Sequence, residues 1–214
     1  MNLKKKLLQK SNLYVIIDKK ICGNRSVSGI ARKLRDSGVD IVQFRDKISS
    51  RRDFFRGAEI VSKVFTGSPV LFIINDYPDA ATVIECDGIH IGQDDFPVWA
   101  VRKIIGREKI IGVSCHSGRE AVRAEREGAD YIGIGPVFPT LTKPEASALG
   151  TGLVRYCKRE VHLPFFPIGG ITESNAGNVL SSGARTLCVC GAILNADNIN
   201  KKVKEFKRIL ERPG

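Results

Sequence analysis

Short apolar runs rich in β-branched residues recur along the chain, and amphipathic segments separate them. A run that is apolar on both faces is typical of a strand buried on both sides, as in a parallel sheet covered by helices. We predict eight such strands, which are LYVII (13–17), IVQF (41–44), VLFII (70–74), GIHI (88–91), IIGV (110–113), YIGIG (131–135), FFPIG (165–169) and TLCVC (186–190).

The intervening segments carry the start and stop signals of helices. Ser117 stands three residues before Glu120, which is the spacing of a capping box, and Gly128 marks the expected end of that helix. Ser50 begins a second predicted helix, in which Phe54 and later apolar residues at helical spacing form one stripe. Strands and helices are therefore expected to alternate along the chain.

Eight strands alternating with about eight helices predict an α/β fold, namely a single (β/α)8 TIM barrel. We expect the barrel to be one domain over residues 1–214, with residues 1–10 as a basic N-terminal extension. An open doubly wound sheet is the competing arrangement. The sequence has neither the G-x-G-x-x-G fingerprint nor the Walker A loop that such sheets often carry, so the barrel is favoured.

The composition narrows the range of partners. The chain has 34 Lys and Arg against 23 Asp and Glu, and this net charge of +11 favours anionic ligands without identifying them. We expect phosphorylated small molecules and no nucleic acid, because basic repeats with interleaved aromatic residues are missing. We also expect no membrane association, because no segment approaches the roughly 20 apolar residues of a membrane span.

Two further features bear on the compartment. The N-terminal MNLKKKLLQK is basic, but the apolar run after it is shorter than that of a signal peptide and is followed by charged residues, so we expect a cytoplasmic protein. The six cysteines form no C-x-x-C pair and are expected to be reduced, packed thiols. Cys188 and Cys190 should face the same side of one strand.

Polar residues or glycines follow seven of the eight predicted strands. In a barrel, the carboxyl ends of all strands meet at one mouth, where such folds build their active sites. These positions are Gln43, Arg45, Asp46 and Lys47 in and after the second strand, Asn75 and Asp76 after the third, Gly92 to Asp95 after the fourth, Ser114 to His116 after the fifth, GPVFPTLTKP (135–144) after the sixth, and Gly169–Gly170 and Gly191–Ala192 after the last two.

The charged residues of these segments have two interpretations each. Arg45 and Lys47 alternate along an extended segment, so they can face one anion, or they can pair with neighbouring aspartates. Asp76 and Asp95 come from neighbouring strands and offer hard oxygen ligands. Mg²⁺ needs only one or two carboxylates plus substrate phosphate oxygens, but each aspartate could equally cap the turn that follows it.

The uncharged residues are more specific. Ser114 is best interpreted as a hydrogen-bond donor to a phosphate oxygen, because no G-x-S-x-G elbow surrounds it. His90 is expected to pack within its strand, and His162 to lie at the surface. The glycines after the last two strands can receive a phosphate on backbone N–H groups, although two tight turns with positive φ would also require glycine.

Six segments together carry a resemblance to a known family. QFRDK, IIND, DGIHIGQDDFP, GVSCH, GADYIGIGPVFPTLTK and IGGIT, between about residues 13 and 195, resemble the thiamine-phosphate synthases, and GPVFPTxTK with HIGQxD is the distinctive combination. The resemblance implies a (β/α)8 transferase. Its reaction joins 4-amino-5-hydroxymethyl-2-methylpyrimidine diphosphate to 4-methyl-5-(2-phosphoethyl)thiazole, or to the 2-carboxylate of that thiazole, and gives thiamine phosphate and pyrophosphate.

The resemblance also implies which residues form the site. Four of them, Arg45, Lys47, Ser114 and Lys143, would stabilise the leaving diphosphate and so act in catalysis. The full implied set is Gln43, Phe44, Arg45, Asp46, Lys47, Asn75, Ser114 and Lys143 for the pyrimidine diphosphate, Asp76 and Asp95 for the cofactor Mg²⁺, Thr140, Leu141 and Thr142 for the thiazole, and Gly170, Cys190 and Gly191 for the thiazole phosphate. Family members often carry Ser where this chain has Gly191.

Two alternative functions stay open at this point. A related thiazole tautomerase would not need a diphosphate and metal site, so the set of Arg45, Lys47, Asp76, Asp95 and Lys143 favours the synthase. A basic nucleic-acid-binding protein is the alternative outside catalysis, and salt-sensitive binding to arbitrary duplex without turnover would identify it. A homo-oligomer is compatible with the sequence.

Overall fold

The computed structural model describes residues 3–140 and 147–211. Within these residues the chain forms eight parallel strands, and each predicted apolar run contributes one of them. The strands are β1 (Leu13–Asp18), β2 (Ile41–Arg45), β3 (Leu71–Asn75), β4 (Gly88–Ile91), β5 (Ile110–Cys115), β6 (Tyr131–Ile134), β7 (Phe165–Pro167) and β8 (Leu187–Val189).

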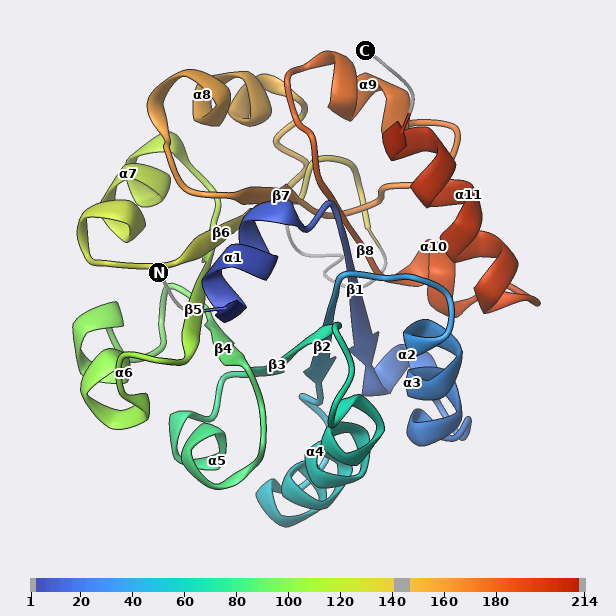
Figure 1. Ribbon diagram of the computed structural model, residues 1–214. Helices are drawn as coiled ribbons and strands as arrows, with labels where there is room; N and C mark the ends of the chain where they lie inside the picture. Colours follow the sequence, from blue (N-terminus) through green and yellow to red (C-terminus); the bar gives the residue numbers. More distant parts are fainter. Residues whose placement is uncertain (1–2, 141–146, 212–214) are drawn as a thin grey trace.

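Helices alternate with the strands and form a ring outside them (Figure 1). Helix α1 precedes the first strand, and two helices instead of one follow each of β1 and β8. The helices are α1 (Leu3–Lys10), α2 (Lys19–Cys22), α3 (Val27–Arg35), α4 (Arg51–Phe65), α5 (Pro78–Val83), α6 (Val98–Ile105), α7 (Gly118–Arg126), α8 (Gly152–Glu160), α9 (Ala176–Ser181), α10 (Gly191–Leu194) and α11 (Ile199–Glu211).

The strands are arranged as a nearly closed barrel. Their hydrogen-bonded order is β7-β6-β5-β4-β3-β2-β1-β8, so consecutive strands from β1 to β7 are paired and β8 is paired with β1. An isolated parallel bridge between Ile168 and Cys188 brings the end of β7 beside β8 and nearly completes the ring. The predicted TIM barrel is confirmed, and the open doubly wound sheet is excluded.

Side chains alternate between the inside and the outside of this barrel, because successive residues of a strand point to opposite faces. Even-numbered residues of β1, such as Tyr14 and Ile16, belong to a buried cluster inside the barrel, which Leu8 of α1 joins. Odd-numbered residues of β1, such as Val15, belong to the larger cluster between strands and helices. The register between strands therefore decides which polar residues face the interior.

The predicted helix starts are present, with one difference. Ser50 Oγ accepts from Asp53 N–H at 3.2 Å, and Ser117 Oγ accepts from Glu120 N–H at 3.2 Å. In a capping box the Glu120 carboxylate would return to Ser117 N–H. It instead accepts from the N–H of His116 at 2.7 Å, one residue farther back. This contact joins the end of β5 to the start of α7.

The N-terminal lysine-rich segment forms helix α1 across one end of the barrel (Figure 1). Lys4 Nζ lies 3.1 Å from Asp87 Oδ1, and Lys5 Nζ lies 2.7 Å from Asp130 Oδ1. Both aspartates precede strands, so α1 covers the end at which the strands begin. The opposite end, where the strands finish, is the end at which the predicted site residues lie. Within the described ranges, no helix is long and apolar enough to cross a membrane.

Candidate active site

The side-chain alternation along the strands sorts the predicted site residues. Gln43 and Arg45 share the face of β2 that carries Ile41, a member of the interior cluster, and Gln43 is 1% exposed. Ser114 shares the inward face of β5 with Ile110. Polar groups from different strands thus enter one space at the carboxyl end of the barrel.

Arg45 is held by a carboxylate from the neighbouring strand. Its Nη1 donates to Oδ2 of Asp18, the residue that pairs with Arg45 in the β1–β2 register. Asp18 is almost completely buried, and its Oδ1 also accepts from the N–H of Lys20 at 2.9 Å, which caps α2. One carboxylate therefore anchors a helix and orients the guanidinium, whose other N–H groups stay available to an anion.

Lys47 and Asp76 form the second ion pair of the site. The Lys47 ammonium contacts Asp76 Oδ2, and the Asp76 side chain is 12% exposed against 48% for Lys47. Asp76 has a φ of 71°, the one positive φ recorded for a non-glycine residue in the described chain. Such a conformation is uncommon outside glycine and is often retained at functional sites. The loop after β3 thus presents a carboxylate beside a cation.

Asp95 lies after β4, the strand next to β3. Its Oδ2 accepts from the N–H of Gly92 at 2.6 Å, so it closes the turn that follows the strand. This contact is the capping role considered for it, and it leaves the other carboxylate oxygen for another partner. Among residues 3–140 and 147–211, no group of three or more His, Cys, Asp and Glu side chains is arranged to hold a metal.

Ser114 and Gln43 are joined through buried rings. Ser114 Oγ lies 2.8 Å from His90 Nε2, and His90 Nδ1 lies 3.0 Å from the hydroxyl of Tyr131. Tyr131 Oη is 2.8 Å from Tyr14 Oη, which accepts from Gln43 Nε2 at 2.8 Å. His90 is buried, as expected for a packed residue, but it is also a direct neighbour of the predicted phosphate donor.

Phe44 and Asp46 have structural contacts of their own. Phe44 faces outward, with its ring centroid 5.7 Å from that of Phe54 on α4. Asp46 Oδ1 accepts from the N–H groups of Ile48 and Ser49 at 3.1 and 3.0 Å and closes the turn after β2. The Phe44 ring is thus packed against a helix, and the Asp46 carboxylate shapes the turn that carries Lys47.

The loop after β6 is bound to the loop after β7. Phe138 N–H donates to the carbonyl of Gly169 at 3.0 Å, and Gly170 has a φ of 61°. A Cβ at Gly170 would collide with the carbonyl oxygen of Pro139 and lie 2.8 Å from Phe138 Cβ. Close approach thus requires glycine here, whether or not a phosphate binds. Thr140 ends this described segment, and three other predicted residues, Leu141, Thr142 and Lys143, lie outside the described residues.

Cys190 and Gly191 lie at the start of α10. Cys190 is the N-cap, and its thiol donates to the carbonyl of Ile16 at 3.3 Å. Burial raises the pKa of Cys190, and nearby Asp18 raises it further, so the thiol stays protonated. Gly191 is the first residue of the helix, where a backbone N–H has no partner within the helix. Cys188 is buried in the interior cluster, and Cys190 packs against that cluster, but Cys190 follows β8 instead of lying in the strand as predicted.

Comparison with known proteins identifies the family. Residues 13–193 match the family model described as thiamine monophosphate synthase. This chain belongs to the thiamine monophosphate synthase family. It is 38% identical over 203 residues to the thiamine-phosphate synthase of Halalkalibacterium halodurans, a match that covers 94% of this chain and 96% of that protein. The family resemblance deduced from the six sequence segments is confirmed.

Two further thiamine-phosphate synthase relatives agree with this assignment. The protein from Shouchella clausii is 40% identical over 188 residues, which cover 87% of this chain and 90% of that protein. The solved structure of a thiamine phosphate pyrophosphorylase from Pyrococcus furiosus has a TM-score of 0.85 and 31% sequence identity, and the match covers 98% of each chain. The chain therefore spans nearly the full length of these synthases.

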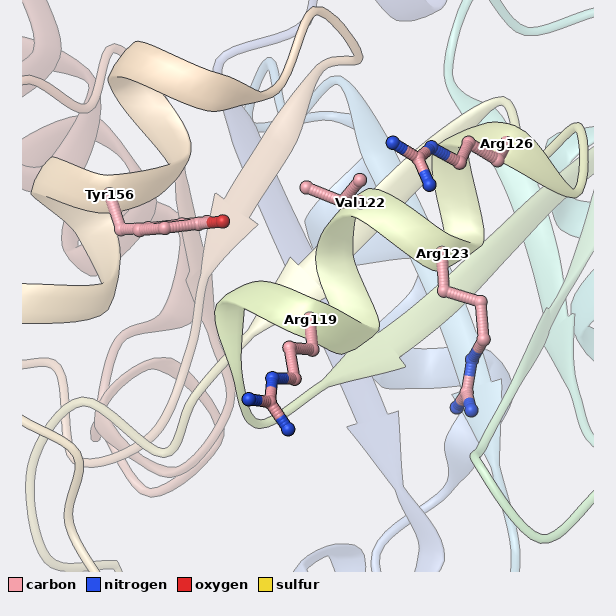
Figure 2. A pocket seen from close by; sticks show the side chains of 5 residues that line it. All are labelled: Arg119, Val122, Arg123, Arg126 and Tyr156. Carbon is pink, nitrogen blue, oxygen red and sulfur yellow. The ribbon is translucent and has the colours of Figure 1, made fainter.

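A surface hollow lies between the outer helices α7 and α8 of this synthase-family barrel. It has a volume of about 340 Å³ and is lined by Arg119, Val122, Arg123, Arg126 and Tyr156. Figure 2 shows Tyr156 of α8 reaching towards α7, which carries the other four residues. Arg123 Nη2 donates to Gln93 Oε1, so one of the three arginines is bound to the loop after β4. The hollow lies between two outer helices rather than inside the barrel.

The sequence did not point to three residues that contact the predicted site residues or their neighbours: Asp18, Tyr14 and Tyr131. Asp18 immediately follows the apolar run LYVII, so the rule applied to the other seven strands would have found it. The two tyrosines had a weaker signal. Gly112 lies within an apolar strand run, which indicates a close neighbour, and a Cβ there would collide with the Tyr131 ring.

Proposed function

We propose that this chain catalyses the condensation of 4-amino-5-hydroxymethyl-2-methylpyrimidine diphosphate with 4-methyl-5-(2-phosphoethyl)thiazole or its 2-carboxylate. The products are thiamine phosphate and pyrophosphate. The observation that carries the proposal is the arrangement of Arg45, Lys47 and Asp76 at the carboxyl ends of neighbouring strands in a chain of this family. Cations at that place suit a diphosphate leaving group.

The chemistry requires stabilisation of a leaving group more than a strong base. The bond between the pyrimidinylmethyl carbon and the diphosphate oxygen breaks, and its electron pair leaves with pyrophosphate. The electron-rich aminopyrimidine delocalises the resulting cation, and the thiazole nitrogen then supplies the electron pair of the new C–N bond. The positive charges of Arg45, Lys47 and Lys143, and the hydroxyl of Ser114, would stabilise the charge that develops on the diphosphate.

Mg²⁺ is the cofactor that we propose for this reaction. Asp76 and Asp95 would hold it, because their carboxylates are hard oxygen ligands and arise from the adjacent strands β3 and β4. Asp76 Oδ2 already contacts one cation, the Lys47 ammonium. This ion pair supports the proposal that the Asp76 carboxylate binds a positively charged group. When bound, the ion would neutralise charge on the diphosphate. The remaining ligands of a two-carboxylate site would be substrate and water oxygens.

The remaining predicted residues would position the two substrates. Gln43, Asp46 and Asn75 would form the pyrimidine diphosphate side together with the groups named above, and Phe44, whose ring packs outward against α4, would contribute through its backbone. The thiazole side would comprise Thr140, Leu141 and Thr142, with Gly170, Cys190 and Gly191 around its phosphate. We propose that the barrel over residues 1–214 is one catalytic domain acting in the cytoplasm, a setting that suits six free thiols. A homo-oligomer stays a prediction.

The test is an assay of the purified chain with both substrates and Mg²⁺, read for thiamine phosphate and for pyrophosphate. We expect both products, and none when either substrate is omitted. Thiazole carboxylate isomerised without the pyrimidine diphosphate, and no thiamine phosphate formed, would contradict the proposal and favour the tautomerase. Binding to arbitrary duplex that weakens with salt, without turnover, would also contradict it.

A further inference from the structure

Five polar side chains from five strands form one continuous line of hydrogen bonds inside the barrel. The line runs from Gln43 through the hydroxyls of Tyr14 and Tyr131 to His90 and then Ser114. Its four links measure between 2.8 and 3.0 Å. It connects two residues of the proposed diphosphate site through three that have no assigned part in it.

The interior is shaped to hold the two central rings of this line. A Cβ at Gly112 would collide with the Tyr131 ring, and a Cβ at Gly133 would lie 3.3 Å from His90 Cε1. Phe166 packs edge-on against Tyr131, with ring centroids 5.7 Å apart. Glycines on the adjoining strands thus leave the space that these rings occupy. The rings have little freedom to turn, so the hydrogen-bond geometry is fixed by packing.

The direction of the first two links follows from the donors available. The Gln43 amide nitrogen can only donate, so Tyr14 Oη accepts from it. The described neighbour left for the Tyr14 proton is Tyr131 Oη. If Tyr131 donated to Tyr14 instead, the fully buried Tyr14 hydroxyl would keep a proton with no acceptor, which is unfavourable. Burial raises the pKa of both phenols, so each keeps its proton to donate.

The direction of the next two links then follows. Tyr131 uses its proton to donate to His90 Nδ1, which must therefore be unprotonated. A neutral imidazole with a bare Nδ1 carries its proton on Nε2, and that N–H donates to Ser114 Oγ. Ser114 is the acceptor in this bond, so its own hydroxyl proton is not consumed. If His90 Nε2 were instead the acceptor, Ser114 would donate its hydroxyl proton to His90 and could not donate it to a ligand.

We propose that His90 is a positioning residue that holds Ser114 as a donor toward the diphosphate. The network selects the Nε2–H form of His90, and that form fixes the Ser114 oxygen while its proton is offered to a diphosphate oxygen. Tyr131 and Tyr14 act through His90. That the ligand of Ser114 is a diphosphate rests on the proposed function, whereas the direction of the hydrogen bonds does not. The two can therefore fail separately.

The first test reads the protonation of His90 by ¹⁵N–¹H correlation spectroscopy of histidine side chains in the full chain. The chain has three histidines, so His116→Gln and His162→Gln variants assign the spectrum. We expect neutral His90 with a protonated Nε2 and a bare Nδ1. A protonated Nδ1 in the neutral ring would reverse the line of donors and overturn the inference, whatever the enzyme assay gives.

Two matched phenylalanine variants separate this account from simple packing. Tyr131→Phe removes the hydroxyl that donates to Nδ1, so the Nδ1–H form of His90 should become detectable. Tyr14→Phe removes an equally buried hydroxyl but leaves Tyr131 to donate to His90, so the Nε2–H form should persist. Urea unfolding of both variants verifies that each is folded. The same His90 spectrum in the two variants would overturn the inference.

Kinetics then test whether His90 acts through Ser114. His90→Leu should lower kcat/KM for the pyrimidine diphosphate about 10- to 100-fold, the range of one lost bond to a charged group. In the Ser114→Ala background the same substitution should lower it by less than about 3-fold. Equal losses in both backgrounds would overturn the inference. His162→Gln, whose side chain is 91% exposed, is the control and should retain the starting activity.

Discussion

The Arg45 guanidinium is ion-paired with the carboxylate of Asp18, whose side chain is 2% exposed. The same carboxylate caps α2, which begins at Lys19. A buried residue at the end of β1 therefore fixes the cation at the end of β2. Since a long arginine side chain loses freedom when it is ordered, this pairing leaves Arg45 oriented before any anion arrives.

Replacement of Asp18 by asparagine should separate these two roles. Asparagine is also a good N-cap, so α2 should persist, but Arg45 loses its ionic partner. We expect kcat/KM for the pyrimidine diphosphate to fall about 10-fold or more, with a loss of about 1–3 kcal/mol in the free energy of unfolding. Steady-state kinetics and urea unfolding measure both. Asp36→Asn, in an exposed pair with Arg35, is the control. Unchanged kinetics in Asp18→Asn would contradict the role of this pair.

Asp76 should determine the response to Mg²⁺. The Asp76→Asn variant loses one carboxylate charge, so the Mg²⁺ concentration for half-maximal activity should rise by at least about 10-fold. Mn²⁺ binding to the protein with pyrophosphate, followed by electron paramagnetic resonance, should weaken in parallel. Asp79→Asn is a close control, because Asp79 is 67% exposed and pairs with Arg51. The same Mg²⁺ response in both variants would rule out Asp76 as a ligand.

Lys143 should contribute one charge-assisted contact to the diphosphate. The Lys143→Ala variant is expected to lower kcat/KM by about 10- to 1,000-fold, on the order of 1 to 4 kcal/mol. Lys63→Ala is the control. Lys63 is exposed in the last turn of α4, at the end of the barrel opposite to the carboxyl ends of the strands. Lys143→Ala kinetics equal to those of the unaltered chain would refute this assignment.

Gly170 should be required for the junction between the loops after β6 and β7. Gly170→Ala must adopt a φ of 61° and place a methyl group against Pro139, so we expect a loss of about 1–3 kcal/mol in the free energy of unfolding. Gly177→Ala is the matched change, because Gly177 lies in α9 with no neighbour within 4 Å of a new Cβ. It should gain up to about 1 kcal/mol. Calorimetry that ranks Gly170→Ala as the more stable variant would contradict this.

The fold was predictable because each strand is a continuous apolar run. β1 and β3 each end one residue later than the predicted apolar run. Their last residues, Asp18 and Asn75, are polar and so were left out of the runs, but both are paired with the neighbouring strand in the barrel. Helix starts were predictable where a serine caps a helix, as at Ser50 and Ser117. These signals lie within short segments of the chain, so they can be recognised without knowing which segments contact each other.

The site was only partly predictable, because side-chain partners depend on contacts between distant strands. Position after a strand located Arg45, Asp76 and Ser114, but it did not reveal that Asp18 holds Arg45. Nor did it reveal that the hydroxyl of Tyr131, which is 41 residues from His90 in sequence, is the hydrogen-bond partner of His90 Nδ1. The same alternation that turns Gln43 inward turns Phe44 outward, and this becomes evident only once the register of β2 is known.

The most direct test of the central claim is a time course of thiamine phosphate and pyrophosphate from one mixture of both substrates and Mg²⁺. The unaltered chain should form the two products in equal amounts, and Arg45→Met should slow both together by about 10-fold or more. Pyrophosphate released without thiamine phosphate, or an Arg45→Met rate equal to that of the unaltered chain, would contradict the account.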